Sequence, residues 1–328
     1  MASGKRVLVT GAGGFIGSHL VERLVRDGNL VRAFVHYNAE SSWHNLEKIP
    51  ADVLAQVEVI NGDIADPFFV DSAVAGCDVV YHLAALIGIP YSYVAPAAYV
   101  STNIVGTVNV LQACRRHQTP RMVHTSTSET YGSAQYVPID EAHPLVGQSP
   151  YSASKIGADK LVESYWRSFE LPVCTIRPFN TFGPRQSARA FIPTIIMQAL
   201  SGDVVRLGNL DPVRDMTFVT DTAAGFVAGA ASDKCLGTVC NLGVGQGISV
   251  GDLARKVGRL LGKELIIETD QQRLRPEKSE VSRLISDNSK MRELSGWAPQ
   301  VSLDEGLAQT IDYVRSNLKD YRINQYNV

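Results

Sequence analysis

The chain has 328 residues, of which 45% are hydrophobic and 20% are charged, and its formal net charge is −2 at pH 7. A chain of this length can bury a substantial core without disulfides or metals, so a small stapled fold is excluded. The charge is close to zero, which excludes an overall field that would attract nucleic acid or a membrane surface. We therefore expect neither partner, and an anionic ligand requires a local cluster of positive side chains.

The cysteines and the apolar segments indicate the compartment. The cysteines are odd in number, scattered and without CxxC pairs, so we expect buried, reduced thiols and no metal site; they are Cys77, Cys114, Cys174, Cys235 and Cys240. The start of the chain lacks the pattern of a signal peptide. The longest apolar stretch, residues 79–89, is too short to span a bilayer. These features predict a cytoplasmic protein.

Short β-rich segments alternate with amphipathic helical segments through the first half of the chain. The predicted helices include residues 15–26, 97–117 and 151–169, and the predicted strands cover residues 6–10, 30–35, 57–61, 79–83, 122–125 and 173–177. Such alternation is typical of parallel strands joined by right-handed helical crossovers. The sequence thus predicts an α/β fold with a Rossmann-type, doubly wound parallel sheet.

The pattern changes after residue 179, where glycine and proline divide the chain into shorter pieces. The strand–helix pattern returns at residues 217–231 and 238–242. We therefore predict a dinucleotide-binding domain over residues 1–179, with returns near 217–245. Residues 180–216 and 246–328 would form a small, interleaved C-terminal cap that binds substrate over the carboxyl ends of the strands, where open α/β sheets bind their ligands.

The first predicted strand leads directly into a glycine-rich turn. The segment reads VLVTGAGGFIG, which places Gly11, Gly14 and Gly17 around the start of the helix that Phe15 and Ile16 begin. Gly11 permits the tight turn, Gly14 admits a diphosphate close to the backbone, and Gly17 lets the helix pack on the strand. The helix N-terminus then supplies amide donors for the phosphates. This turn predicts a dinucleotide cofactor.

The second predicted strand ends without the acidic residue that commonly binds the ribose hydroxyls of NAD. His36 and Asn38 stand there instead, and no arginine is present at that point to hold the 2′-phosphate of NADP. After the third strand, Asp63 and Ile64 are candidates for contact with the adenine. The residues favour NAD, and NADP stays open.

A tyrosine and a lysine stand four residues apart at the start of a predicted helix. This spacing puts Tyr151 and Lys155 on one helix face. A phenol is ordinarily a poor base at neutral pH, but a neighbouring ammonium group favours its phenolate form. Tyr151 can then accept the proton of a substrate hydroxyl while a hydride leaves the same carbon. We assign Tyr151 as this base and Lys155 as its electrostatic partner, both beside the cofactor.

Together, the glycine turn and the Tyr-Lys pair resemble those of the short-chain dehydrogenase/reductase superfamily in its extended form. The resemblance covers nearly the whole chain, because further motifs follow in the family's order: HLAA from His82, NIVGT from Asn103, RPFN from Arg177, RDMTFV from Arg214 and NLG from Asn241. It implies a nucleotide-sugar substrate and a homodimer built from the helices near 97–117 and 151–169. It also implies further cofactor contacts at Leu83, Ala84, Ala85, Asn103 and Thr125.

The segment TSTSETYG, which follows the fifth predicted strand, indicates the reaction. In this resemblance Thr127 hydrogen-bonds the sugar oxygen that is oxidised, and Glu129 stands where a 4,6-dehydratase has its C5 base. Oxidation at C4 makes the C5 proton acidic; its removal expels the C6 hydroxyl as water, and hydride returns to C6. Many dehydratases have Asp-Glu here, whereas this chain has Ser128-Glu129, as the GDP-mannose dehydratases do. The acid that protonates the C6 hydroxyl therefore stays open among Ser128, a water and Glu129.

Arginines in the predicted cap are candidates for binding the substrate phosphates, because guanidinium groups match phosphate oxygens well. They are Arg185, Arg189, Arg206, Arg214, Arg273 and Arg275. The family resemblance implies that Arg214 and Arg275 hold the diphosphate and that Asn180 contacts the substrate. Pro90 and Tyr93, which follow the fourth strand, are expected to cover the sugar.

Three longer segments, residues 135–141, 183–189 and 275–281, are similar to those of N-acetylglucosamine-nucleotide 4,6-dehydratases of the legionaminic acid type. They imply an NAD(P)-dependent 4,6-dehydratase that acts on UDP- or GDP-linked N-acetylglucosamine. Two other reactions stay open. UDP-glucuronate decarboxylases also have Thr-Ser-Glu before Tyr-Gly, and a 4-epimerase would leave Glu129 without a role. A dinucleotide-binding sensor or scaffold is the non-enzymatic alternative.

Overall fold

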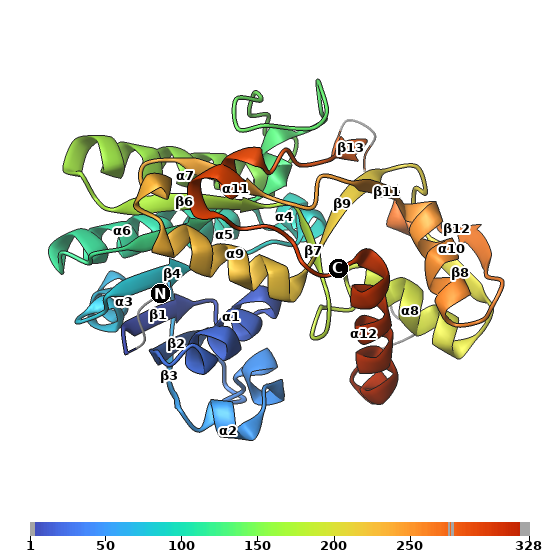
Figure 1. Cartoon of the computed structure of the whole chain (residues 1–328), viewed down its shortest axis with the longest axis horizontal. Helices are drawn as coiled ribbons and strands as arrows, with labels where there is room; N and C mark the ends of the chain where they lie inside the picture. Colours follow the sequence, from blue (N-terminus) through green and yellow to red (C-terminus); the bar gives the residue numbers. More distant parts are fainter. Residues whose placement is uncertain (1–3, 275, 277–278, 322–328) are drawn as a thin grey trace.

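The computed structural model describes residues 4–274, 276 and 279–321. Its largest sheet has seven strands, all parallel, in the order β3-β2-β1-β4-β5-β6-β10 (Figure 1). They are β1 (Arg6–Thr10), β2 (Leu30–His36), β3 (Val57–Gly62), β4 (Val79–His82), β5 (Met122–Thr125), β6 (Val173–Pro178) and β10 (Val239–Leu242). This confirms the predicted Rossmann-type α/β fold.

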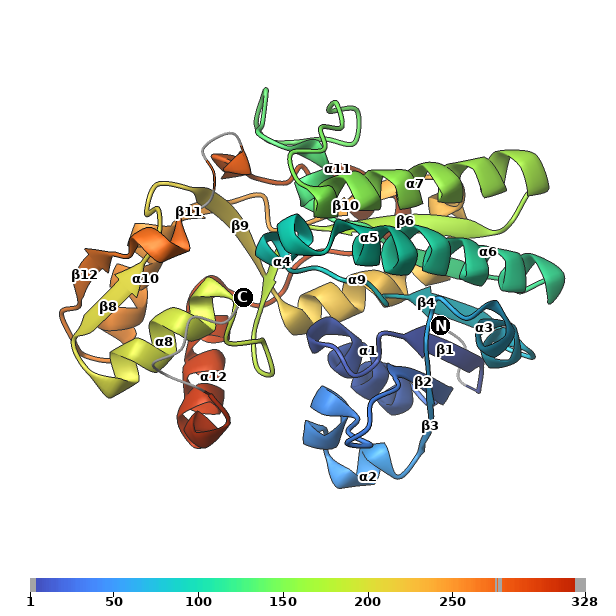
Figure 2. The ribbon, with the colours of Figure 1, turned by 180° about the vertical axis from the view of Figure 1, so that it is seen from behind.

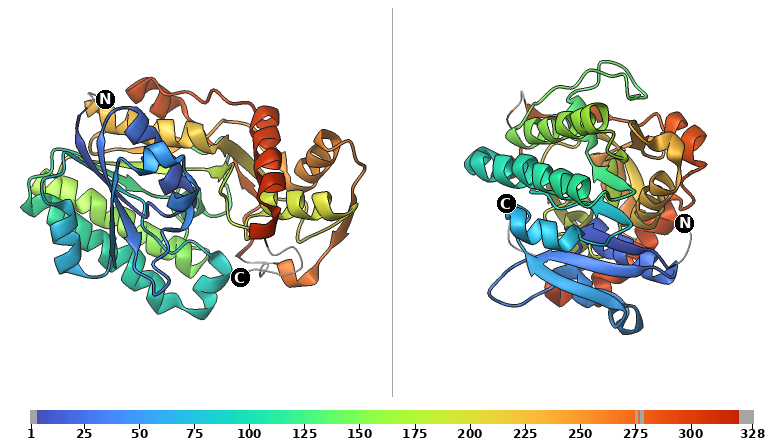
Figure 3. Two further views of the ribbon diagram at one scale, coloured as in Figure 1. Left: turned by 90° about the horizontal axis from the view of Figure 1, so that it is seen from below. Right: turned by 90° about the vertical axis from the view of Figure 1, so that its left-hand side faces the viewer.

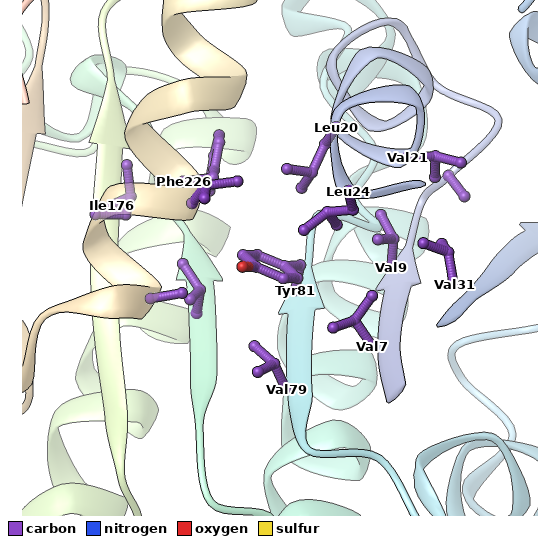
Figure 4. Packing of buried hydrophobic residues seen from close by; sticks show 14 of the residues in the cluster. Val7, Val9, Leu20, Val21, Leu24, Val31, Val79, Tyr81, Ile176 and Phe226 are labelled. Atoms are coloured by element: carbon purple, nitrogen blue, oxygen red, sulfur yellow. The ribbon is translucent and has the colours of Figure 1, made fainter. Parts of the chain in front are cut away.

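Helices cover both faces of this sheet. One face carries α1 (Phe15–Arg26), α9 (Val219–Ala231) and α11 (Ser289–Ser295), and the other carries α3 (Pro67–Val74), α6 (Gly106–Arg116) and α7 (Pro150–Phe169). Figure 4 shows the hydrophobic core on the face covered by α1, α9 and α11, where Leu20, Leu24 and Phe226 pack over Val9 and Tyr81. The strands are apolar on both sides, as expected for a parallel sheet enclosed between two helical layers.

The helix predicted over residues 97–117 is interrupted. It consists of α5 (Pro96–Tyr99), a π-helical segment, η2 (Val100–Val105), and α6. Within the π segment the Asn103 side chain reaches out of the helix and binds the backbone of Leu86. A π-helical turn adds a residue to the helical ladder and changes which face a side chain occupies. The predicted helical stretch is thus confirmed, with a π segment inside it that the spacing did not indicate.

Three smaller groups of elements complete the chain (Figures 1 and 3). A second sheet pairs β9 (Val213–Phe218) with β7 (Asn180–Phe182), β11 (Gly247–Ser249) and β13 (Arg283–Leu284). A two-stranded sheet joins β8 (Val204–Leu207) to β12 (Ile266–Thr269), and α8 (Phe191–Ser201), α10 (Val250–Leu260) and α12 (Leu303–Ser316) share one apolar core with it. Short segments are α2 (Ala51–Leu54), α4 (Ile89–Val94), η1 (His44–Lys48), η3 (Ser128–Tyr131), η4 (Asp233–Cys235), η5 (Gln271–Arg273) and η7 (Leu318–Asp320).

The predicted return of the strand–helix pattern is confirmed in part. The chain comes back to the large sheet through α9 and β10, but Thr217 and Phe218 belong to β9 of the second sheet. The five cysteines are unpaired and buried, as predicted. Within the described part of the chain, no helix is long and apolar enough to cross a membrane.

Candidate active site

The glycine turn lies at the carboxyl edge of the sheet, between β2 and β4. Thr10 is level with Phe34 of β2 and His82 of β4, so the turn that follows sits at the strand ends. Gly11 has φ +69°, and a Cβ there would come within 2.8 Å of the Ala84 nitrogen. A Cβ on Gly17 would lie 2.2 Å from the Gly11 oxygen. Only glycine fits these two positions: Gly11 for the tight turn, as predicted, and Gly17 because α1 packs against the turn itself and not against the strand.

Helix α1 begins at the predicted phosphate position. Its N-cap, Gly14, has no side chain to cap the helix, and the Phe15–Ile16 amides begin its first turn. The turn is therefore open to an external anion, which the helix dipole and the amide donors both favour. This arrangement fits the diphosphate of a dinucleotide.

The loop after β4 faces this turn. Thr10 Oγ1 accepts hydrogen bonds from the Leu83 and Ala84 amides, both at 3.1 Å, and so holds the start of the loop that continues through Ala85. Asn103 Nδ2 donates to the Leu86 carbonyl at 2.9 Å, and its Oδ1 accepts from the Leu86 amide at 2.8 Å. Asn103 thus positions the loop, and the cofactor contact that the resemblance implies for this residue stays a prediction.

At the ends of β2 and β3, the predicted ribose and adenine residues have different surroundings. His36 is exposed, Asp63 accepts from the Ala65 amide at 2.9 Å, and Ile64 is buried. Asn38 donates to the Ser42 carbonyl at 2.8 Å and accepts from the Ser42 amide at 3.0 Å. Both polar atoms of Asn38 therefore shape its own loop, and a direct contact of its side chain with the cofactor does not fit this geometry.

The tyrosine and the lysine project from the first turns of α7. Ser149 and Ser152 form a capping box that fixes the helix start, and Tyr151 and Lys155 are 7% and 4% exposed. Lys155 Nζ donates to the Thr125 carbonyl at 2.7 Å, so the end of β5 and the helix are tied together beside the cofactor turn. Burial lowers the pKa of Lys155 to about 8. The predicted pair is thus buried and adjoins the strand end.

Thr127, Ser128 and Glu129 come between β5 and Tyr131 at the same edge. Thr127 Oγ1 accepts from the Glu129 amide at 3.2 Å and hydrogen-bonds the Tyr151 side chain. Burial is the main cause that raises the pKa of Tyr151; the Thr127 hydrogen bond lowers it, and the negative charge of Glu129 raises it further. Ser128 is buried, whereas Glu129 is half-buried. The structure brings a phenol, a hydroxyl and a carboxylate together.

A buried ionic network that lies one helical turn beyond Lys155 was not predicted from the sequence. Asp159, one helical turn further along α7, accepts from Arg177 Nη2 at 2.7 Å, from Ser126 Oγ at 2.6 Å and meets His124 Nε2 at 3.2 Å. Arg177 and the other partners hold the pKa of Asp159 well below its usual range, although burial opposes them. The four-residue step from Lys155 to Asp159 was the available signal, because it continues the face of Tyr151.

Tyr99, which was not predicted, lies between Tyr151 and the predicted substrate residue Arg189. The Tyr99 ring lies 6.2 Å from the Tyr151 ring, and a Cβ on Gly88 would lie 3.5 Å from Arg189 Nη1. The Asn180 Oδ1 atom is buried without a hydrogen-bond partner among the described residues. This orphaned acceptor fits a ligand donor.

A second set of predicted substrate residues lies on α4 and β9, which are joined by the chain before β13. Pro90 lies in α4, whose Tyr93 hydroxyl hydrogen-bonds the Ser279 hydroxyl. Buried Arg214 of β9 lies 3.6 Å from Glu280. Residues 279–280 thus contact both α4 and β9. The predicted phosphate ligand Arg275 lies outside the described residues.

Two further predicted phosphate ligands, Arg185 and Arg206, form ion pairs within the chain. Arg185 turns toward α1, where its Nη2 pairs with Glu22 at 2.7 Å and contacts His19. Arg206 of β8 is exposed and forms a surface ion pair with Glu268 at 3.0 Å. The buried pairing of Arg185 with α1 does not fit a contact with a sugar nucleotide at Tyr151, so that prediction is corrected. The contact expected of Arg206 stays a prediction. Both arginines were chosen by residue type, which does not indicate where a side chain points.

Comparisons with known proteins show the family to which the chain is similar. A family model described as GDP-mannose 4,6 dehydratase matches residues 8–310. The chain is 32% identical to a dTDP-glucose 4,6-dehydratase of Actinoplanes sp., over 95% of this chain and 98% of that protein. It is 31% identical to a UDP-glucose 4-epimerase of Mycolicibacterium smegmatis, over 95% and 99%. The crystal structure of the dTDP-glucose 4,6-dehydratase DesIV from Streptomyces venezuelae, with NAD bound, superposes with a TM-score of 0.86 at 29% identity, covering 96% and 98% of the two chains.

Proposed function

The chain belongs to the GDP-mannose 4,6-dehydratase family of NAD-dependent epimerases and dehydratases, and we propose that it is a nucleotide-sugar 4,6-dehydratase. The proposal is carried by one observation: the Thr127 hydroxyl accepts from the Glu129 amide at 3.2 Å and also hydrogen-bonds Tyr151, so Glu129 and Tyr151 share one partner. A carboxylate beside the oxidation site is what removal of a C5 proton requires. The reaction would convert a nucleotide-linked hexose into its 4-keto-6-deoxy product.

NAD is the proposed cofactor, since relatives of this fold bind it. Its diphosphate would lie against Gly14, Phe15 and Ile16, and its adenosine near His36 and Asp63. It would accept the hydride from C4 and return it to C6. The lack of an arginine after β2 supports NAD over NADP.

In the proposed mechanism, Tyr151 removes the proton of the C4 hydroxyl. Lys155 stabilises the phenolate electrostatically, and Thr127 orients the C4 oxygen through the hydroxyl that already bonds Tyr151. Burial alone disfavours the phenolate, so the nearby positive charge is necessary. The three residues hold and move a single proton at the C4 oxygen.

Glu129 is the proposed base at C5. Once C4 is a ketone, the C5 proton is acidic, and its transfer to Glu129 allows the C6 hydroxyl to leave as water. Buried Ser128 is neutral, so the proton for that hydroxyl would come from Glu129 itself or through a water bound near Ser128. A 4-epimerase needs no base at C5, so Glu129 would have no role in that reaction. A decarboxylase needs a cation for the C6 carboxylate, whereas Ser128 is neutral and Glu129 is acidic.

UDP- or GDP-linked N-acetylglucosamine is the proposed substrate. Residues 180–216 and 246–328 would form the region that binds it, with Arg189 and Arg214 near the diphosphate and Asn180 at the sugar. Pro90 and Tyr93 would cover the sugar from α4, where Tyr93 already meets Ser279. The sequence similarity to dehydratases of the legionaminic acid type supports the N-acetyl group.

The first experiment is mass spectrometry of the enzyme incubated in heavy water with a panel of nucleotide sugars. The panel contains UDP- and GDP-N-acetylglucosamine, UDP-glucose, GDP-mannose, dTDP-glucose and UDP-glucuronate. We expect one substrate to lose a water and to retain a single deuteron from solvent. Glu129→Gln should slow this dehydration at least about 100-fold, while the absorbance of reduced nicotinamide still appears because C4 oxidation remains possible.

The control is Glu163→Gln, which neutralises an α7 carboxylate that pairs with Lys160 and Arg167 at the surface. It should dehydrate the substrate at the wild-type rate. Unimpaired dehydration by Glu129→Gln would overturn the role of Glu129. An unchanged mass with inverted C4, or loss of carbon dioxide, would instead identify an epimerase or a decarboxylase, and cofactor binding without turnover would identify a sensor.

We further propose a homodimer and a cytoplasmic location. Helices α6 and α7 lie side by side on one face (Figure 2), as the family's dimer requires. Two valines of the π segment that leads into α6, Val100 and Val105, are 49% and 44% exposed. Such apolar side chains suit a helical interface. The five unpaired thiols support a reducing compartment.

A further inference from the structure

A cavity of about 490 Å³ lies between α1, the chain that follows β7, and α12. It is lined by cationic side chains, a single carboxylate from Glu22 and apolar groups such as Phe218 and Pro50. The cations among the described residues are Arg23, Arg26, Lys48 and Arg185. None of these residues belongs to the proposed catalytic set around Tyr151. Its volume is within the range of small-molecule sites.

Arg185 is the most deeply placed cation of this cavity. It is 7% exposed, and its Nη2 is occupied by Glu22 at 2.7 Å and by His19 Nδ1 at 2.6 Å. Its Nη1 is buried and has no partner among the described residues. Burial, and then the charge of Arg185, lower the pKa of His19 to about 3, so the imidazole is neutral and adds no charge. An unsatisfied guanidinium nitrogen in a cavity is costly unless a ligand or water accepts its hydrogen bond.

A second donor without a partner among the described residues belongs to Tyr313, which also lines the cavity. The Tyr313 hydroxyl of α12 is buried and makes no hydrogen bond to a described residue. Burial raises the pKa of Tyr313, and the positive charges of Lys48 and Arg185 oppose this rise, so the three groups are neighbours. Lys48 pairs with Asp320 at 3.1 Å, but both side chains are more than one-third exposed, and a pair of this kind contributes little.

The backbone around Arg185 links the cavity to the cofactor turn. Arg185 has φ +69°, a left-handed conformation that a non-glycine residue rarely adopts without surrounding support. Its carbonyl accepts from Asn45 Nδ2 at 3.1 Å, and the Asn45 amide donates to the Gly13 carbonyl at 3.1 Å. Asn45 thus connects Arg185 of the cavity to the glycine turn.

We propose that this cavity is a second ligand site, which binds a small phosphate-bearing anion. A phosphate group would accept hydrogen bonds from Arg185 Nη1 and the Tyr313 hydroxyl and would face the Lys48 ammonium. A phosphate has enough oxygen acceptors for all three, and guanidinium–phosphate contacts are strong. Because the site adjoins the glycine turn, the anion would act as an effector of cofactor binding.

The test is calorimetric titration of the full chain with inorganic pyrophosphate. NAD and UDP are present at saturating concentrations, so that the cofactor and sugar-nucleotide sites are filled. We expect saturable binding that weakens about tenfold in Tyr313→Phe, because that change removes one hydrogen bond to a charged group. Lys48→Met should also weaken binding.

The matched control is Tyr321→Phe, because the Tyr321 hydroxyl donates to the Gln186 carbonyl at 3.4 Å and does not line the cavity. It should bind pyrophosphate as the wild type does. Wild-type affinity in both Tyr313→Phe and Lys48→Met would overturn the proposal, as would the absence of saturable binding in the wild type. Neither variant alters a proposed catalytic residue, so the outcome is independent of the dehydratase assignment.

Discussion

At the scale of single residues, Lys155 shows the conflict between burial and chemistry. Its ammonium is almost fully enclosed, with one hydrogen bond to the Thr125 carbonyl, and burial lowers its pKa to about 8. The charge of Asp159 acts in the opposite direction. The fold therefore keeps a cation beside Tyr151 at neutral pH and accepts a cost in stability.

This cost gives a pH-dependent prediction. The folded pKa of Lys155 is lower than the unfolded one, so its penalty is fully present below pH 8 and disappears as the pH rises toward about 10.4. Lys155→Met should therefore raise the free energy of unfolding at pH 7, by up to about 3 kcal/mol, while abolishing activity. Urea unfolding at pH 7 and pH 10 measures the difference.

Lys160→Met is the control, since Lys160 is exposed on the same helix. It should change stability little at either pH. If Lys155→Met destabilised the protein equally at both pH values, the lost hydrogen bond to Thr125 would outweigh the relief of the buried charge, and the prediction would be wrong.

At the scale of secondary-structure elements, the β1–α1 unit was predictable to the residue, whereas the segment before α6 was not. Strand β1 and helix α1 have the predicted limits because apolar spacing and glycine spacing are local signals. Within the π segment, Asn103 accepts from the Leu86 amide and donates to the Leu86 carbonyl, 17 residues away. Amphipathic spacing alone cannot reveal such a contact.

The packing of α1 against the glycine turn can be tested at Gly17. In Gly17→Ala the new methyl group would meet the Gly11 oxygen at 2.2 Å, so α1 must move away from the turn. We expect a loss of about 1–3 kcal/mol in stability and much weaker NAD binding. Gly202→Ala is the control, since nothing lies within 4 Å of its added Cβ. Thermal unfolding and a fluorescence titration with NAD would measure both effects; unchanged NAD affinity in Gly17→Ala would contradict the prediction.

At the scale of the whole molecule, a buried carboxylate joins the two larger sheets. Asp215 of β9 accepts from the amides of Val244 and Gly245, both at 2.8 Å, which follow β10 of the large sheet. It also accepts from the Ser286 amide at 3.1 Å, just beyond β13. Burial raises the pKa of Asp215 to about 6, although these three donors lower it. Strands distant in the sequence are thus held at one point.

The proposed dimer belongs to this scale as well. Light scattering should give about twice the mass of the 35.6 kDa chain. Val105→Arg should shift the protein toward the monomer, because it places a charge in the proposed α6–α7 interface. Val94→Arg is the control, since Val94 is 76% exposed in α4. A monomeric wild type, or dimerisation that Val105→Arg leaves unchanged, would argue against this interface.

The sequence by itself determined the parallel sheet, the glycine turn and the Tyr151–Lys155 pair. These depend on strand and helix periodicity and on residues a few positions apart, so local spacing is sufficient to specify them. Tertiary structure alone decided which polar side chains face the site. Arg185 meets Glu22 across 163 positions of the chain, and Asp159 meets Arg177 across 18. Side-chain direction depends on such long-range partners, and a linear pattern of residue types carries no record of them.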